Sequence, residues 1–232
     1  MYRFVVAVSL AAASFGVFGA TLNLHGTGFD AAGNPLASSS TSGGTDGSWS
    51  VAGGPAFFIA PGNADWWDGG IDPTNAYAAN TNTATFNGSG WISDNATTPI
   101  NGPVPYSFEM KFDLSDFDLS TVAISGAWSI ADGGTLSING NVIETFLPGD
   151  NPWRSLHPFT VGPSRLNAGE NTVSLTVLQG ARFLEAARFE GVVTGTVVPE
   201  PGTFAFLATG ALMLVACGAR SAMRASPESA IF

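Results

Sequence analysis

The residues of this chain that are best suited to contact a ligand are aromatic. Trp66 and Trp67 form an adjacent pair between two aspartates, and Tyr77 follows in a stretch rich in Gly, Asn and Pro. Trp153 lies in a second segment of this kind, next to an arginine. An exposed ring stacks on the flat C–H face of a sugar while polar neighbours bind its hydroxyl groups. These four side chains predict a carbohydrate contact, with the alternative that the rings only anchor their own loops.

Two groups of carboxylates offer acid–base or metal chemistry. A pair of carboxylates on either side of a glycosidic bond hydrolyses it, and clustered oxygen ligands hold Ca²⁺. Carboxylates this close in sequence usually form turns, in which they accept hydrogen bonds from their own backbone. We therefore predict turns and no metal site, and keep Ca²⁺ as the alternative. The two groups are Asp65, Asp68 and Asp72, and Asp113, Asp116 and Asp118.

The sequence lacks the common catalytic patterns. His25 and His157 are far apart and neither belongs to an H-E-x-x-H motif, so both are predicted to be ordinary loop residues. There is no G-x-S-x-G nucleophile motif. Cys217, the single cysteine, lies in an apolar C-terminal stretch, which leaves the rest of the chain without disulfides or thiols. We predict a non-catalytic protein without a cofactor.

The balance of charge limits the partners. The chain has 8 basic and 18 acidic residues and a formal net charge of −10. This charge excludes nucleic acid as a partner, because phosphates require a basic face. It suits a protein that must stay soluble outside the cell.

The elements that must position these side chains are short strands. Gly, Ser, Thr and Asn separate short apolar runs, and no long helical periodicity occurs. In Tyr106–Phe112 the apolar residues alternate with polar ones, which places Glu109 and Lys111 outside. Asn139-Gly140 suits the positive φ of a tight hairpin turn. We predict an all-β fold, an antiparallel β-sandwich of jelly-roll type.

The expected strands cover residues 106–112, 122–130, 134–138, 142–146, 172–178 and 183–193. Trp49, Trp91 and Trp128 fall in strand-like segments and are predicted to be core residues. Asp30–Gly47 is rich in Ser, Gly and Thr, so a loop or an irregular start is expected there.

Both ends of the chain have the composition of targeting segments. Arg3 precedes an apolar stretch over residues 4–13, and small residues follow at Gly16, Gly19 and Ala20. This pattern predicts a secretory signal peptide over residues 1–20, with an N-terminal membrane anchor as the alternative. The run Thr203–Ala219 contains no charged residue and is followed by Arg220 and Arg224. It predicts a single transmembrane helix with its basic end in the cytoplasm, and a buried core helix is the alternative.

The C-terminal residues also carry a resemblance to a known family. A secretory signal, an extracellular domain, Pro199-Glu200-Pro201, one apolar helix and Arg220 resemble the PEP-CTERM proteins of Gram-negative bacteria. The resemblance implies recognition by exosortase, a membrane protease-transpeptidase. It further implies export through the inner membrane, transient anchoring in membrane lipid and cleavage near the motif. The protein would then reside at the cell surface or in the extracellular matrix.

The resemblance divides the chain into a signal peptide (1–20), an exported domain (21–197), a sorting signal (198–224) and a tail (225–232). The exported domain resembles the β-sandwich, similar to galactose-binding folds, of many PEP-CTERM proteins. This second resemblance rests on the order of short motifs, and it implies no shared ligand. The motifs are 112–115, 124–128, 132–134, 136–140 and 168–172.

Two functions remain open at this point. The first is a structural protein of the envelope or the exopolysaccharide layer, with no catalytic site. The second is a carbohydrate-binding module tethered at the cell surface, which would contact polysaccharide through Trp66, Trp67, Tyr77 and Trp153.

Overall fold

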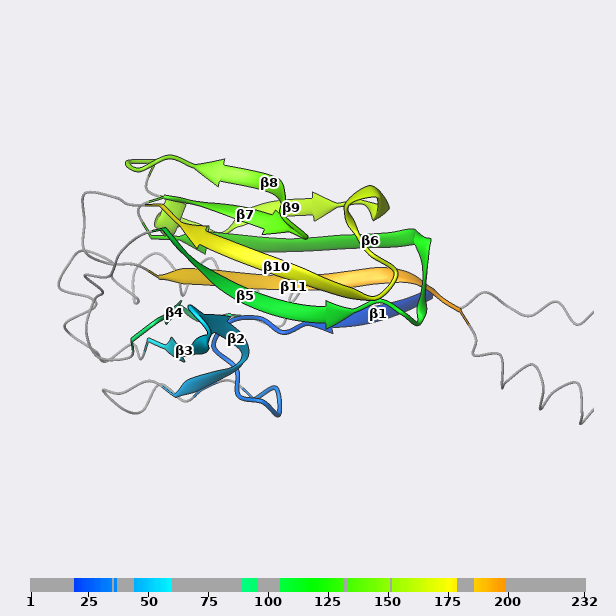
Figure 1. Cartoon of the computed structure of the whole chain (residues 1–232), viewed down its shortest axis with the longest axis horizontal. Coiled ribbons are helices and arrows are strands. Elements are labelled where there is room, and N and C mark those ends of the chain that lie inside the picture. The colour runs from blue at the N-terminus through cyan, green and yellow to red at the C-terminus, as the bar shows by residue number, and fades with distance from the viewer. Residues whose placement is uncertain are drawn as a thin grey trace, which may run out of the picture.

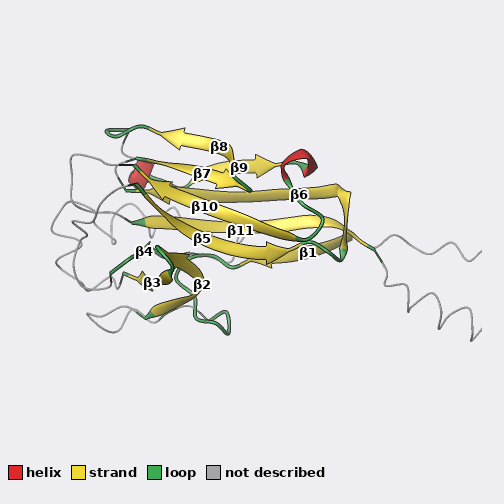
Figure 2. Cartoon of the chain, in the orientation of Figure 1, coloured by secondary structure: helices red, strands yellow, loops and turns green. Residues whose placement is uncertain are grey.

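The described part of the chain is built almost entirely of antiparallel strands. The structure is a computed structural model that describes residues 19–34, 36, 44–59, 89–95, 105–131, 133–150, 152–178 and 186–198. Figure 2 shows strands throughout this part, with short helical turns at η2 (Pro152–Arg154) and η3 (Pro163–Arg165). The predicted all-β, antiparallel fold is confirmed.

The strands follow each other along the chain without an intervening α-helix in the described residues. They are β1 (Gly19–Leu24), β2 (Thr45–Val51), β3 (Gly54–Phe58), β4 (Ile92–Ser93), β5 (Tyr106–Asp113), β6 (Phe117–Ile130), β7 (Gly134–Ile138), β8 (Asn141–Phe146), β9 (His157–Val161), β10 (Glu170–Val177) and β11 (Ala187–Val197).

Hydrogen bonds connect these strands in the order β8-β7-β10-β5-β2-β3-β4-β11-β6-β9, and β1 pairs with β11. Figure 1 shows the order folded into two layers, with β8, β7, β10 and β5 in one and β9, β6, β11 and β1 in the other. The short strands β2, β3 and β4 connect the layers along one side. From β5 onward the chain changes layer at every connection except the β7–β8 hairpin.

Alternation along the strands builds the core between the layers. In β10, Val173, Leu175 and Val177 are buried while the residues between them are partly exposed. In β5, Phe108 and Met110 are buried, and Glu109 and Lys111 are exposed, as predicted. Every second side chain of a strand points to the same face, so this pattern removes one apolar face from water. The largest fully buried side chains are Trp49, Trp128, Phe108, Phe189, Ile92, Met110, Leu114, Ile124, Ile130, Leu136 and Ile138.

The local predictions agree with most of the second half of the chain. The hairpin turn lies at Asn139-Gly140, where φ is +52° and +76°, between the paired residues Ile138 and Asn141. Trp49, Trp91 and Trp128 are buried, as expected. The strand predicted from Val122 begins earlier, at Phe117, and β11 continues to Val197, beyond the predicted end.

Two local predictions are wrong in part. The expected loop Asp30–Gly47 includes the start of β2 at Thr45, because Asp46 forms backbone contacts that the composition did not indicate. His157 is the first residue of β9 rather than a loop residue, whereas His25 does lie in a loop.

Most of the predicted targeting segments lie outside the described residues. This holds for residues 1–18 and for Pro199, Glu200, Pro201, Thr203–Ala219 and Arg220. Gly19 and Ala20, the last residues of the predicted signal peptide, belong to β1 and pair with Thr196 and Gly195. Within the described residues, no helix is long and apolar enough to cross a membrane.

A buried amide fixes the β7–β8 turn to the connection that enters β10. Asn171 is fully buried, and its Oδ1 accepts hydrogen bonds from Asn139 Nδ2 (2.8 Å) and Asn167 N (2.8 Å). Its Nδ2 donates to the carbonyls of Asn167 (2.9 Å) and Gly169 (2.6 Å). A buried amide with its hydrogen bonds formed is costly to remove, because the groups that it bound then stay buried without a hydrogen bond to water or to protein.

Replacing Asn171 with alanine should therefore lower the free energy of unfolding by about 2–4 kcal/mol. Asn141→Ala provides the matched control, since Asn141 is an exposed amide in the same hairpin with long contacts of 3.3 and 3.4 Å. Its cost should stay below about 1 kcal/mol in the same denaturant titration. Equal losses for the two variants would show that the buried network does not stabilise the fold.

Candidate functional site

Trp153, the one predicted sugar-contacting residue that the structure describes, lies on a turn that is firmly held. The turn is η2, and the carbonyl of Pro152 within it accepts hydrogen bonds from Ser129 Oγ (2.9 Å) and Ser155 N (3.3 Å). The same oxygen lies 3.1 Å from His157 Nε2, which must donate because a carbonyl only accepts. These bonds hold η2 against β6 and β9 and leave Trp153 half-buried.

A stack of rings supports this turn from the gap between β8 and β9. Phe146, from β8, stacks on the buried Trp128 with ring centroids 5.1 Å apart. The ring of His157, from β9, has its centroid 4.4 Å from that of Phe146. Trp128 Nε1 donates to Glu144 Oε2 at 2.7 Å. The four side chains come from β6, β8 and β9, so they close the side of the sandwich where the two layers are not joined by backbone bonds.

A polar cluster lies on the outer face of β11, beside the turn that carries Trp153. Arg188 and Glu190 flank the core residue Phe189 and point away from it, yet only 3% and 2% of their surfaces are exposed. Ser89 joins them, because its Oγ accepts from Arg188 Nε (2.7 Å) and donates to Glu190 Oε2 (3.0 Å). Arg188 pairs in register with Ser129, whose hydroxyl holds η2.

Sequence reasoning did not identify this cluster. Charged residues that alternate with an apolar one in a strand normally face water. No local signal at Arg188 or Glu190 shows that this face is covered.

Burial raises the pKa of two carboxyl groups, one in this cluster and one directly after β4. Burial raises the pKa of Glu190, and the Ser89 hydroxyl and the Arg188 guanidinium only partly oppose the change. Burial likewise raises the pKa of Asp94, which follows β4. Both carboxyl groups thus favour the protonated form more than they would in water.

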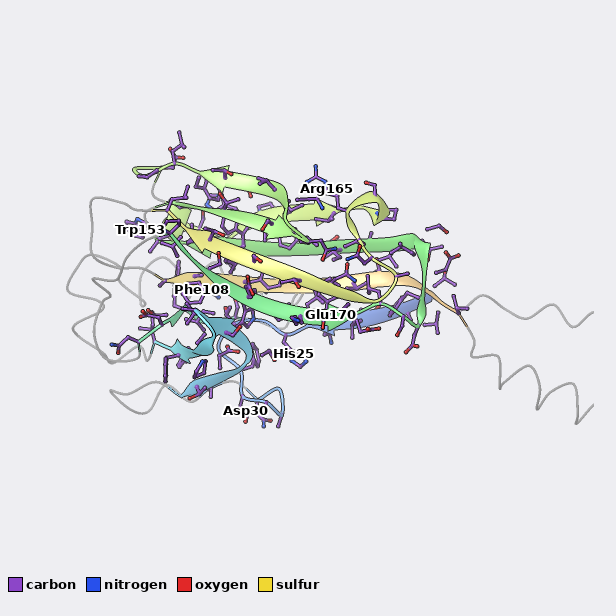
Figure 3. The ribbon with its side chains drawn as sticks, viewed as in Figure 1. His25, Asp30, Phe108, Trp153, Arg165 and Glu170 are labelled. Atoms are coloured by element: carbon purple, nitrogen blue, oxygen red, sulfur yellow. The ribbon has the colours of Figure 1, made fainter. Side chains whose placement is uncertain are left out.

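The structure does not bring the predicted aromatic residues together. Trp66, Trp67 and Tyr77 lie outside the described residues. The ends of the segment that carries them are described, and they lie close to each other. Ile59 N donates to the carbonyl of Trp91 at 2.9 Å, and Ser89 is bound to β11 as above. Figure 3 places Trp153 at the end of the sandwich opposite to the end where β11 stops.

The second carboxylate group forms turns, as predicted. Asp113 Oδ1 accepts from Ser115 N at 2.7 Å, and Asp118 Oδ1 accepts from Ser120 N at 3.0 Å. Asp65, Asp68 and Asp72 lie outside the described residues. In the part of the chain that the structure describes, no three His, Cys, Asp or Glu side chains are arranged to hold a metal ion.

Comparison with known proteins gives only distant structural likenesses. No protein-family model and no curated protein matches the chain. A family 35 carbohydrate-binding module from Clostridium thermocellum is similar over 47% of this chain and 81% of its own, with 14% identity and a TM-score of 0.29. The module CBM36 in complex with calcium and xylotriose matches 48% of this chain and 92% of its own, with 15% identity and a TM-score of 0.25.

A third likeness is longer but no closer. The PA14 sugar-binding domain from an RTX adhesin is similar over 77% of this chain and 88% of its own, with 10% identity and a TM-score of 0.25. At TM-scores this low the three likenesses carry no conclusion about the ligand of this chain.

The raised pKa values predict that acidification stabilises the fold. Burial raises the pKa of Asp46 and Asp94 above the usual value of 3.8, and that of Glu190 above the usual value of 4.5. Between the usual and the raised pKa values, the folded chain therefore keeps protons that the unfolded chain has lost. Unfolding free energy must then fall as pH rises through the folded pKa values. The pKa values of Asp30 and Asp113 are lowered by hydrogen bonds, so these two groups lower the free energy of unfolding as the pH falls below their usual pKa of 3.8.

We expect a higher melting temperature at about pH 5 than at about pH 7.5. Glu190→Gln should reduce this difference, because one of the three groups no longer titrates. Glu109→Gln removes the same charge from the exposed face of β5 and serves as the control. A melting temperature that rises steadily from about pH 5 to about pH 8 would contradict the assignment.

Proposed function

We propose that this chain is an exported, non-catalytic protein of the cell surface or extracellular matrix. It reaches that location through a PEP-CTERM sorting signal and presents a jelly-roll-like β-sandwich. The end of this sandwich that carries Trp153 binds polysaccharide. The observation that carries the proposal is that the N-terminal and C-terminal strands pair at the end of the sandwich opposite to Trp153.

The pairing of β1 with β11 brings both termini of the described domain to one end. Gly19 pairs with Thr196, and Val198 N donates to the carbonyl of Asp116 at 2.8 Å in the adjoining β5–β6 connection. Figure 1 shows β1 starting and β11 ending at this end. The proposed sorting signal begins at Val198, where the strand has ended.

This arrangement orients an anchored protein. If residues 203–219 lie in the bilayer, the end of the sandwich that holds the termini faces the membrane. The opposite end, with Trp153, then faces the extracellular polysaccharide. A binding surface at the far end can reach a ligand while the chain is still anchored.

The surroundings of Trp153 suit a sugar contact. The ring stands on a turn that is fixed by three contacts to one carbonyl, so little conformational entropy is lost when a ligand binds. Trp153 is half-buried, and the polar side chains of Ser155 and His157, which lie 3.3 Å apart, follow it along the chain. A structural protein without a ligand is the first of the two functions that the sequence left open, and the binding test separates it from the carbohydrate-binding module.

Affinity electrophoresis of the full chain in polysaccharide-containing gels tests the binding. We expect retardation, and Trp153→Ala should weaken it about tenfold, which corresponds to the loss of about 1.4 kcal/mol. Trp66→Ala and Trp67→Ala test the other predicted contacts in the same way. Val198→Ala removes an exposed apolar side chain, 51% exposed, at the opposite end and should change nothing. Absence of retardation by any polysaccharide would leave the purely structural role.

The sorting signal is tested separately from binding. Replacing Pro199, Glu200 and Pro201 with alanine should prevent processing by exosortase, because the residues that it recognises are lost. Immunoblots of fractionated cells should then show a longer polypeptide in the membrane fraction, whereas the native chain appears shortened and outside. Glu228→Ala, in the tail that follows the sorting signal, serves as the control. An intact native chain in the cytosol would contradict the proposal.

A further inference from the structure

The hydrogen-bonded path through the sheet ends at β8 and at β9, and both of these strands lie at the same side of the sandwich. Among the described strands, β8 bonds only to β7, and β9 bonds only to β6. The rings of Phe146 and His157 fill the space between them. A strand with an unpaired edge offers its N–H and C=O groups to any other strand, so such edges favour aggregation unless they are protected.

β9 is protected by its own sequence. Pro158 lies within this five-residue strand and is exposed. A proline has no N–H to offer to an added strand, and within sheets it is confined to edges of this kind. β9 is therefore unsuitable for pairing with another chain.

β8 has no such residue, and its outer face carries an exposed apolar side chain. Val142 is 56% exposed and Leu147, directly after the strand, is 64% exposed. Both are among the most exposed large apolar side chains of the described residues. The pairing with β7 also shifts register between Leu136 and Ser137, which leaves Ile143 as an extra residue in β8.

Two side chains from outside the strand occupy backbone groups of this edge. Arg165 Nη1, from η3, donates to the carbonyl of Val142 at 2.6 Å. At the other end, Asp150 Oδ2 accepts from Leu147 N at 2.7 Å. Figure 3 shows Arg165 on this side of the sandwich. A charged donor makes a stronger hydrogen bond than a neutral one, and a carbonyl that is already bound is less available to a second strand.

We propose that β8 is a latent self-association edge, which Arg165 keeps closed by binding the Val142 carbonyl, and that its occupant is a second copy of this chain. A second copy fits this edge because the edge is self-complementary. Because Ile143 is an extra residue in each strand, antiparallel pairing of two β8 strands about a two-fold axis at Thr145 places Val142 opposite Leu147 of the second copy, and the reverse.

The pairing would remove both apolar side chains from water at once. Val142 pairs with Ser137 on the outer face of the layer, as Thr145 pairs with Thr135, and Leu147 continues this face after the inward Phe146. Glu144 would lie opposite Phe146 of the second copy, on the inward face that both residues share, so no like charges face each other. The result is one continuous sheet through two molecules. This inference does not depend on polysaccharide binding.

The net charge of −10 opposes association at long range but does not protect the edge itself. Repulsion between exposed charges is screened within about 10 Å at 0.1 M salt. Association through β8 should therefore become stronger, not weaker, as salt increases.

Sedimentation of the full chain in mild detergent tests the proposal. Arg165→Ala, and Arg165→Met with its similar stem, should lower the concentration at which half the molecules associate by at least about tenfold. Both variants make the chain more acidic, so charge repulsion alone predicts the opposite. Lys111→Ala makes the same change of charge in an exposed ion pair with Glu170 and should behave like the native chain.

A second substitution identifies the edge. Adding Val142→Lys to Arg165→Ala should restore the native behaviour, because a lysine on an edge strand blocks pairing. The proposal is overturned if neither Arg165 variant associates more than the native chain while circular dichroism shows an intact sheet. It is equally overturned if the double variant associates as strongly as Arg165→Ala.

Discussion

The pairing of β11 with β6, β4 and β1 is the interaction on which the rest of this structure depends. β11 is the last described strand, but it lies inside the sheet and contributes Phe189 and Val193 to the core. Its contacts reach far back in the chain, as in the hydrogen bond from Phe189 N to Thr27 Oγ1 across 162 positions. Pairing over such separations must overcome a large loop-closure entropy, so we expect the sandwich to close late in folding.

The same strand decides how the protein is oriented. Its final residues pair with β1, so the segments that precede and follow the domain leave from one end. Its first residues lie beside β4 and the Ser129–Pro152 contact, so they help to build the opposite end with Trp153. A single long strand thus separates the end suited to anchoring from the end suited to contact with a ligand.

Buried polar groups connect the irregular segments to this frame. Asp46, which is 4% exposed, accepts from the backbone N–H groups of Gly28 (2.7 Å), Ser48 (2.9 Å) and Trp49 (2.9 Å). Thr27 Oγ1 donates to the carbonyl of Gly90 at 2.6 Å. Buried polar groups are stable only when their hydrogen bonds are formed, so each of these contacts holds a loop in one position. Arg188, Ser89 and Glu190 do the same for the chain that enters β4.

Much of the second half of the fold was predictable because its signals are local. The alternation around Phe108 and Val173 and the Asn139-Gly140 turn each depend on neighbouring residues. The strands β1 and β3 were not predicted, since residues 19 and 20 were assigned to a signal peptide and residues 54–58 lack a clear alternation. For β2 and β4 the sequence indicated only strand-like segments around Trp49 and Trp91. Of the candidate site, Trp153 was correctly singled out as a loop residue, whereas the polar cluster on β11 was not recognised.

The sequence alone determined which segments form strands and which side of most strands is apolar, because both follow from a two-residue period within a few positions. Only the tertiary structure decided the order of the strands, the common end of the two termini and the burial of Arg188 and Glu190. The physical reason is that a strand's own residues specify its faces but not its neighbours, and the neighbours are chosen by how all the apolar faces can be covered together.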